Sequence, residues 1–186
     1  MITDKTFRTE LVRTFLVDGL PEPLERNSPH LQIFDNYIHQ TQLRLRSIRV
    51  PETKEWALLL QKRYPFGEYR AEWRIEEIEL SGAEYGHFKP FEGNEIRKNR
   101  YYSEIDGCRF EFDAYLGPLW GLNRARVEFS DRAEMDRFVF PQFGLAETTD
   151  EPFFDDANLV NCTFEDVQAE IGKLVDRSSG KAAPTS

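Results

Sequence analysis

The sequence predicts a single α+β domain whose strands form an antiparallel barrel or sandwich. Strand-forming segments recur at short spacing with turns between them, charged residues alternate along several of these segments, and helical patterns are few. The 186 residues are a one-domain length that can bury an ordinary core. We expect one domain over residues 1–176, followed by a small, polar and disordered tail over residues 177–186.

The composition argues against several classes of function. The net charge of −9 disfavours broad nucleic-acid binding, although a basic pocket could lie inside an acidic exterior. The sequence has no apolar run long enough to span a membrane, and its polar N-terminal residues do not resemble a secretory signal. The two cysteines and three scattered histidines lack the spacing of a zinc site. We therefore expect a cytoplasmic protein without membrane contact.

Four segments in the first half of the chain have strand patterns. Residues 9–17 begin the series and are rich in β-branched side chains. Residues 33–50 predict a hairpin whose second arm alternates leucine with arginine. Residues 56–62 are mostly apolar, and residues 69–80 alternate charged with apolar side chains. Together these segments account for most of the chain before residue 80.

The second half of the chain begins with a predicted hairpin and one further strand. Residues 95–102 and 108–115 flank an Asp-Gly turn, which is a strong hairpin signal. Residues 123–129 form the last long strand pattern. The strands therefore outnumber any helical segments in this half as well.

Helices are expected over residues 82–88, 131–139 and 163–176. Asp131 is a candidate N-cap, with Glu134 at the capping-box position. The C-terminal helix can be capped by Thr163 and has the clearest periodicity. Its apolar stripe consists of Phe164, Val167, Ile171 and Leu174. This stripe should pack against the barrel or a partner subunit.

Several strands carry charges at a period of two, which places each set on one face. These faces could be solvated, with the apolar faces forming the core. Alternatively, the charges could line the interior of a barrel, where they would need to be paired or bound to a ligand. The sets are Arg44 with Arg46, Glu72 with Arg74 and Glu76, Lys98 with Arg100, Glu111 with Asp113, and Arg126 with Glu128.

The order and spacing of several motifs resemble those of the CYTH, or triphosphate-tunnel, superfamily. The first strand, ELVRTFLV at residues 10–17, is similar to the family's opening Glu-x-Glu-x-Lys strand. The other matching segments are DNYIHQTQLRLR at 35–46, LLQK at 59–62, RAEWRIE at 70–76, IRKNRY at 96–101, FDAYLGPLWGL at 112–122, RVEF at 126–129 and GLAETTDEPFFDDANL at 144–159. The resemblance covers about residues 7–160.

This resemblance implies a closed eight-stranded antiparallel β-barrel with a few flanking helices, in which the barrel interior is a tunnel. Family members bind triphosphate-containing ligands, and many hydrolyse them with Mg²⁺ or Mn²⁺. Basic side chains neutralise phosphate oxygens, and carboxylates hold the hard divalent ion. The implied ligand-binding residues here are Arg44, Arg46, Lys62, Lys98 and Arg100. The implied metal ligands are Glu10, Glu76 and Glu128, and the implied catalytic residues are Glu10 and Glu128.

The sequence departs from the family pattern where the metal chemistry should lie. Val12 replaces a glutamate, Thr14 replaces a lysine, and Arg74 and Arg126 stand where carboxylates are usual. With every strand in the expected register, the lumen would be more cationic than the family pattern. Arg74 and Arg126 could be paired internally with Glu76 and Glu128. They could instead bind ligand by supplying charge that a metal ion would otherwise supply.

Three functions are consistent with the sequence. The first is a tunnel protein with a degraded metal site that binds inorganic triphosphate, a nucleotide or polyphosphate. The second is a divergent triphosphatase that depends on Mg²⁺ or Mn²⁺. The third is a structural barrel whose internal charges only neutralise each other. The sequence is also compatible with a homodimer.

Overall fold

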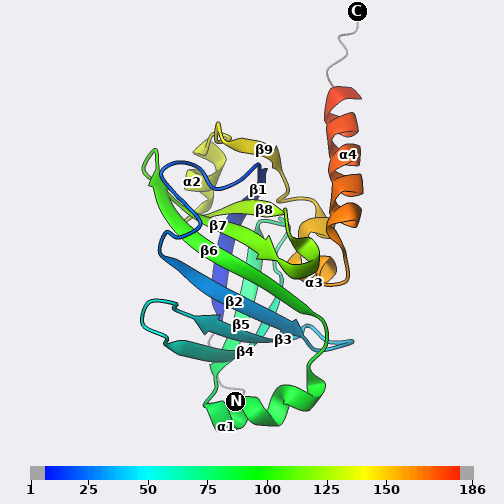
Figure 1. The fold of residues 1–186 in the computed structure, drawn as a ribbon. Helices are drawn as coiled ribbons and strands as arrows, with labels where there is room; N and C mark the ends of the chain where they lie inside the picture. The colour runs from blue at the N-terminus through cyan, green and yellow to red at the C-terminus, as the bar shows by residue number, and fades with distance from the viewer. Residues whose placement is uncertain (1–6, 181–186) are drawn as a thin grey trace, which may run out of the picture.

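The structure is a computed structural model that describes residues 7–180, and eight of its strands build the expected barrel (Figure 1). A ninth, short strand, β9, was not expected from the sequence. The strands are β1 (Arg8–Val17), β2 (His30–Tyr37), β3 (Leu43–Arg49), β4 (Trp56–Pro65), β5 (Glu72–Glu79), β6 (Glu95–Ile105), β7 (Cys108–Leu116), β8 (Asn123–Glu128) and β9 (Gly144–Glu147).

The barrel closes because β1 pairs with strands at both ends of the sheet. The order is β5-β4-β3-β2-β6-β7-β8-β1, and every pairing is antiparallel. The first half of β1 pairs with β5, from Arg8 opposite Ile75 to Leu11 opposite Glu72. Its second half pairs with β8, and β9 adds to β1 along the same region. The predicted α+β fold with a closed eight-stranded barrel is confirmed, and the sandwich is excluded.

Local sequence signals explain the hairpin between β6 and β7. Asp106 and Gly107 both adopt positive φ angles, of 52° and 75°. A two-residue turn of this kind matches the twist of the flanking strands, and Asp-Gly favours it because glycine has no Cβ to clash. The turn fixes Ile105 opposite Cys108 and thereby sets which side chains of both strands face inward.

The main hydrophobic core lies outside the barrel wall rather than inside it. Outward-facing side chains of β1, β7 and β8, including Phe15, Phe112 and Val127, are almost fully buried. They are covered by α2 (Arg132–Arg137), through Met135, and by the segment between β1 and β2, through Leu24. Because this core lies outside the wall, the barrel interior can hold many charged side chains.

A second apolar cluster packs across one end of the barrel. Inward-facing Leu16 and Ile96 join Phe154 and Leu159, which belong to η3 (Pro152–Phe154) and α3 (Asp156–Leu159). Val167 of α4 (Phe164–Gly180) completes the cluster and is fully buried. This end of the tunnel is consequently covered by the segment that follows β9.

The C-terminal helix confirms the expected cap and apolar stripe. Oγ1 of Thr163 accepts a hydrogen bond from the backbone N–H of Asp166 at 3.4 Å. Besides Val167, the stripe residues Phe164, Ile171 and Leu174 pack against the second cluster.

The three expected helices are present with changed lengths for two of them, and the other short helices of the structure were not expected from the sequence. The C-terminal helix continues to Gly180, four residues beyond its expected end at 176, and residues 181–186 of the expected tail lie outside the described residues. The other helices are α1 (Gly82–Phe88), η1 (Lys89–Phe91) and η2 (Gly117–Leu119). Within residues 7–180, none of the helices is long and apolar enough to cross a membrane.

Candidate functional site

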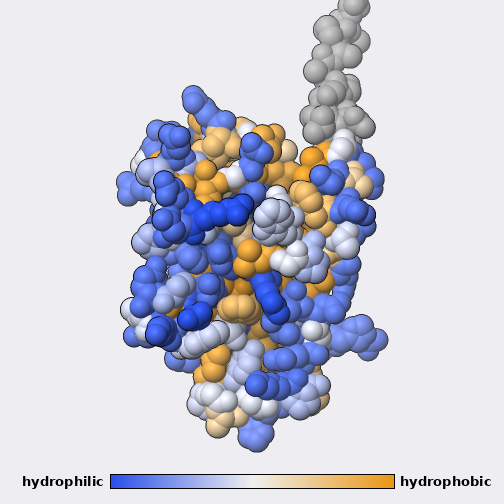
Figure 2. Space-filling view, in the orientation of Figure 1, coloured by the Kyte–Doolittle hydropathy of each residue, from blue (hydrophilic) through white to orange (hydrophobic). Residues whose placement is uncertain are grey.

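The barrel encloses a charged cavity of about 260 Å³. Nine arginine and lysine side chains and six carboxylates line it, so cations outnumber anions although the whole chain is acidic. Space-filling Figure 2 shows an outer surface that is hydrophilic over most of the visible face, with apolar side chains between. The charge of the interior therefore has the opposite sign to the charge of the whole protein.

The first strand has the register that the sequence predicts. Its even-numbered residues Arg8, Glu10, Val12 and Thr14 line the cavity. The two uncharged side chains, Val12 and Thr14, are the positions that depart from the family's opening motif. Glu10 is therefore the carboxylate that β1 contributes to the cavity.

Most of the expected ligand-binding residues also lie together in the cavity wall. The strands β3, β6 and β8 bring them in from different parts of the sheet. Glu128 lines the cavity as well, and its side chain is 41% exposed, which places it near a rim. The basic residues placed as expected are Arg44, Arg46, Lys98, Arg100 and Arg126.

The expected placement of β5 is wrong by one residue, because its apolar face and not its charged face points inward. Trp73 and Ile75 line the cavity. Arg74 lies outside, where its guanidinium stacks between the rings of Phe7 and Phe66 at 3.7 and 3.9 Å. These cation–π contacts explain how a charged side chain is accommodated there. Arg74 is therefore not a lumen residue.

Lys62 and Glu76 are also outside the cavity. On β4 the inward positions are Gln61, which accepts a hydrogen bond from Arg44, and Arg63. Lys62 lies on the opposite face over the ring of Tyr64, whose hydroxyl donates to Glu76. The sequence has adjacent basic residues at 62 and 63, and alternation alone did not identify which of them faces inward.

Asp35 is the central carboxylate on β2 and has no exposed surface. Arg46 donates to both of its oxygens at 2.6 Å, and Arg44 approaches at 3.3 Å. Burial alone would raise the pKa of Asp35, but the two arginines outweigh it and lower the pKa to about 2. This carboxylate is charged at neutral pH and fixes both arginines in place.

A second network joins β6, β7 and β8. Arg100 donates to both oxygens of Asp113 at 2.6 and 2.7 Å and contacts Glu111 at 2.7 Å. Arg126 donates to the same Glu111 at 2.8 Å. Such bidentate pairs hold guanidinium groups in defined orientations.

A third network is centred on Asp156, which sequence analysis did not single out. Its carboxylate accepts hydrogen bonds from Lys98 at 2.6 Å and from the hydroxyl of Tyr115 at 2.5 Å. Arg124 lies 3.5 Å away. Lys98 and Arg124 hold the pKa of Asp156 well below its usual range despite burial, which by itself would raise it. The only sequence signal was the Asp-Asp pair within the segment 144–159.

Comparison of the structure with solved structures places this geometry in a known fold. Two structures of NE1496, one described as an inorganic triphosphatase, have TM-scores of 0.56 and 0.57 at 23% identity. They cover 81% and 83% of this chain, and 93% and 99% of the other. A conserved hypothetical protein from Pyrococcus furiosus has a TM-score of 0.45 at 15% identity, with coverage of 84% and 93%.

The chain has the same fold as NE1496. The barrel implied by the CYTH resemblance is thereby confirmed at the level of fold. Comparison of the sequence with protein-family models and with curated proteins gave no match. The shared fold thus accounts for the position of the cavity, and the side chains of this chain determine what the cavity can hold.

The carboxylates expected to bind metal are not arranged as a metal site. Glu76 lies outside the barrel, and Glu10 is held by arginines. Among the side chains that the structure describes, no group of three or more histidine, cysteine, aspartate or glutamate residues is arranged to hold a metal ion. Oxygen ligands surrounded by guanidinium groups do not fit Mg²⁺ or Mn²⁺. The arginines that contact Glu10 are Arg8 at 2.9 Å, Arg126 at 2.9 Å and Arg63 at 3.5 Å.

Arg63, Arg70 and Arg124 are the cavity arginines with incomplete pairing: Arg70 has one ion pair, with Asp155 at 3.0 Å, and a buried Nε without a partner among the described residues. Arg63 has one long contact, to Glu10, and stacks on Trp73 at 3.7 Å. Burial lowers the pKa of Arg63, and Arg44 and Arg126 lower it further, so that it is about 10 although Glu10 opposes the shift. The buried Nε of Arg124 has no hydrogen-bond partner within the described part of the chain. Arg124 already faces Asp156, whereas Arg63 has no short ionic contact with any described residue and is suited to an additional anion.

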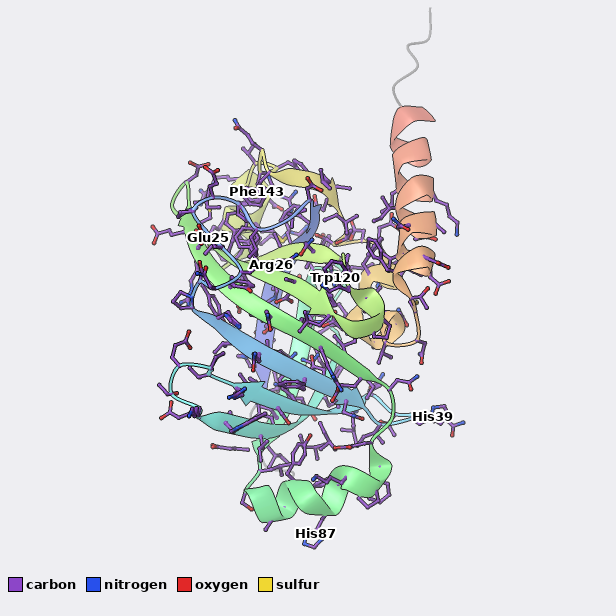
Figure 3. The ribbon with its side chains drawn as sticks, viewed as in Figure 1. Glu25, Arg26, His39, His87, Trp120 and Phe143 are labelled. Atoms are coloured by element: carbon purple, nitrogen blue, oxygen red, sulfur yellow. The ribbon has the colours of Figure 1, made fainter. Side chains whose placement is uncertain are left out.

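Histidines do not contribute to this site. None of the three lines the cavity. Figure 3 shows His39 at the hairpin between β2 and β3 and His87 on α1, both directed away from the barrel. A histidine general base is therefore not part of the cavity wall.

Proposed function

We propose that the tunnel binds a triphosphate-containing anion directly on its arginine and lysine side chains, without a carboxylate-bound metal ion. The observation that carries this proposal is the excess of cations in the cavity, nine against six carboxylates. A polyanion with several phosphate groups would neutralise this excess. Guanidinium groups suit the task because their planar donors match phosphate oxygens.

Arg63 is the principal contact in this proposal. Its side chain is 23% exposed and lies near the like charges of Arg44 and Arg126, and its contact with Glu10 at 3.5 Å is too long to satisfy its donors. Burial and the neighbouring arginines lower the pKa of Arg63, and the negative charge of an adjacent phosphate group would offset both effects. The ligand would therefore bind next to the cavity arginine whose positive charge is least neutralised by the protein.

The proposal favours binding over turnover because the carboxylates are already engaged. For Glu10 to hold Mg²⁺, it would have to release contacts with Arg8 and Arg126 at 2.9 Å. Arg126 also lies between Glu10 and Glu128 and contacts both. The positive charge that a metal ion supplies in a triphosphatase is supplied here by Arg126.

The internal pairs support a second candidate, a structural barrel without a ligand. Asp35 and Asp113 each have short contacts with cationic side chains, and such networks can exist for folding alone. The two candidates differ in what they predict for Arg63, which a structural barrel would not need to leave under-neutralised.

Calorimetric titration of tripolyphosphate tests the proposal. The titration is done first with a chelator and then with Mg²⁺, alongside an assay for released phosphate. We expect saturable binding with chelator and an affinity that changes little when Mg²⁺ is added. Binding only with Mg²⁺ together with rapid hydrolysis would establish the divergent triphosphatase. If tripolyphosphate, nucleoside triphosphates and longer polyphosphate all fail to bind, the structural barrel is correct.

A further inference from the structure

Asp156 differs from the other central carboxylates of the cavity because it does not come from a barrel strand. It is the first residue of α3, in the segment that covers one end of the barrel. Its side chain is only 13% exposed, and it lies between Lys98 and Arg124, two cations of the barrel wall. A carboxylate from a covering segment thus occupies a position that a phosphate group could take.

The backbone around Asp156 is anchored on both sides. Phe154 and Leu159 are fully buried in the second apolar cluster. The carbonyl oxygen of Phe154 also accepts a hydrogen bond from Arg124 at 2.5 Å. The side chain of Asn158 donates to the carbonyl of Pro152 at 2.6 Å. The carboxylate is therefore a fixed part of the wall and not the tip of a mobile loop.

Asp156 also stands at the junction of two cavities. A second cavity of about 190 Å³ adjoins the first and shares Asp155, Asp156, Arg44, Arg63 and Trp73 with it. Unlike the first, it is bordered by Tyr37, Tyr64 and Pro65. A linear phosphate chain that bound along the first cavity and extended toward the second would meet the carboxylate of Asp156.

We propose that Asp156 is a resident anion that limits the length of phosphate chain the tunnel accepts. It occupies the anion position between Lys98 and Arg124, so a linear polyphosphate can use Arg63, Arg100 and Arg126 but gains nothing from a further phosphate at this end. The tunnel then selects short chains over long ones. This inference rests on the proposed binding function and assigns Asp156 a specificity role within it.

The test compares pyrophosphate, tripolyphosphate and tetrapolyphosphate by calorimetry in the presence of chelator. In the wild type we expect tripolyphosphate to bind more tightly than pyrophosphate, and tetrapolyphosphate to bind no more tightly than tripolyphosphate. Asp156→Asn keeps the shape but removes the charge, and should bind tetrapolyphosphate roughly 10- to 100-fold more tightly, with a smaller gain for tripolyphosphate. Asp150→Asn removes the same charge from an exposed site on the same connection and should leave the series unchanged.

Each outcome decides between the two proposals. If the wild type binds but Asp156→Asn shows no gain, or if Asp150→Asn shows an equal gain, Asp156 does not set chain length. If neither the wild type nor Asp156→Asn binds any chain, the proposed function itself fails, and this inference fails with it. Thermal unfolding shows whether Asp156→Asn is folded. If Asp156→Asn is not folded, the wild-type series still decides. An affinity that rises steadily from pyrophosphate through tetrapolyphosphate would contradict the proposed limit on chain length.

Discussion

At the scale of single residues, strongly paired and weakly paired arginines have different roles in the cavity. Arg46 and Arg100 are held by bidentate contacts with buried carboxylates and contribute fixed positive charge. Arg63 stacks on Trp73 and has one long ion-pair contact. Removing a paired arginine should therefore affect folding, whereas removing Arg63 should mainly affect binding.

Arg63→Gln is expected to lower the affinity for tripolyphosphate roughly 10- to 100-fold, because it removes a charge-assisted contact of about 1.5–3 kcal/mol. The melting temperature without ligand should change little, since Arg63 gains little from its contact with Glu10. The matched control is Arg74→Gln, which removes the same charge from the outer face of the neighbouring strand. Titration of both variants checks this, and equal losses of affinity would contradict the role of Arg63.

Asp35→Ala should destabilise the fold by about 3–5 kcal/mol, because it leaves Arg44 and Arg46 without their buried counter-ion. Urea unfolding at pH 7 measures the change. Asp136→Ala, on the exposed helix α2, is the control and should cost much less. A loss below about 1 kcal/mol for Asp35→Ala would show that water compensates the two arginines.

At the scale of elements, alternation predicted the strands well and their inward faces less well. Charges at even positions of β1, β3, β6 and β8 do face the cavity. On β5 the same rule fails, because a period of two defines two faces without saying which one is inside. Trp73 faces inward through its stacking on Arg63, and Arg74 faces outward between two aromatic rings. These contacts depend on the fold and cannot be inferred from the strand alone.

The strand β9 and the carboxylate of Asp156 could not be predicted from the sequence, for other reasons. The strand β9 has only four residues, which is too short for alternation to be recognised. Asp156 acts through residues 32 to 58 positions earlier in the chain, Arg124 and Lys98. Long-range ion pairs of this kind leave no local pattern.

Val167→Asp is expected to destabilise the protein by about 3 kcal/mol or more, because it places a charge in the fully buried contact between α4 and the barrel end. Gln168→Asp adds the same charge on the exposed face of the helix and is the control. Thermal unfolding of both variants measures the difference. Equal melting temperatures would show that α4 is dispensable for stability.

At the scale of the whole molecule, the internal ion pairs make stability depend on pH. Asp35 has a pKa of about 2, and the pKa values of Asp113 and Asp156 are also well below the usual range. Each carboxylate has a lower pKa in the folded state than in the unfolded state, where it is about 3.9. Their stabilisation is therefore complete above about pH 5 and is lost as the pH falls through 4 toward 2 and below.

The free energy of unfolding should fall steeply between pH 5 and pH 2.5, with Asp35 alone accounting for about 2.5 kcal/mol of the full effect. Urea titrations at a series of pH values measure the slope. Asp35→Asn should flatten it, since that group no longer titrates. An unchanged slope in Asp35→Asn would assign the acid sensitivity to other carboxylates.

The closure of the barrel by β1 has a consequence for the order of folding. This strand is made first during synthesis, yet its partners β5, β8 and β9 end at Glu79, Glu128 and Glu147. Contacts so distant in sequence give a high contact order, which slows folding because long loops must close before the contacts form. The apolar side chains at the end of β1 therefore stay without their native contacts until most of the chain has been synthesised. The first strand translated is thus the last whose neighbours are complete.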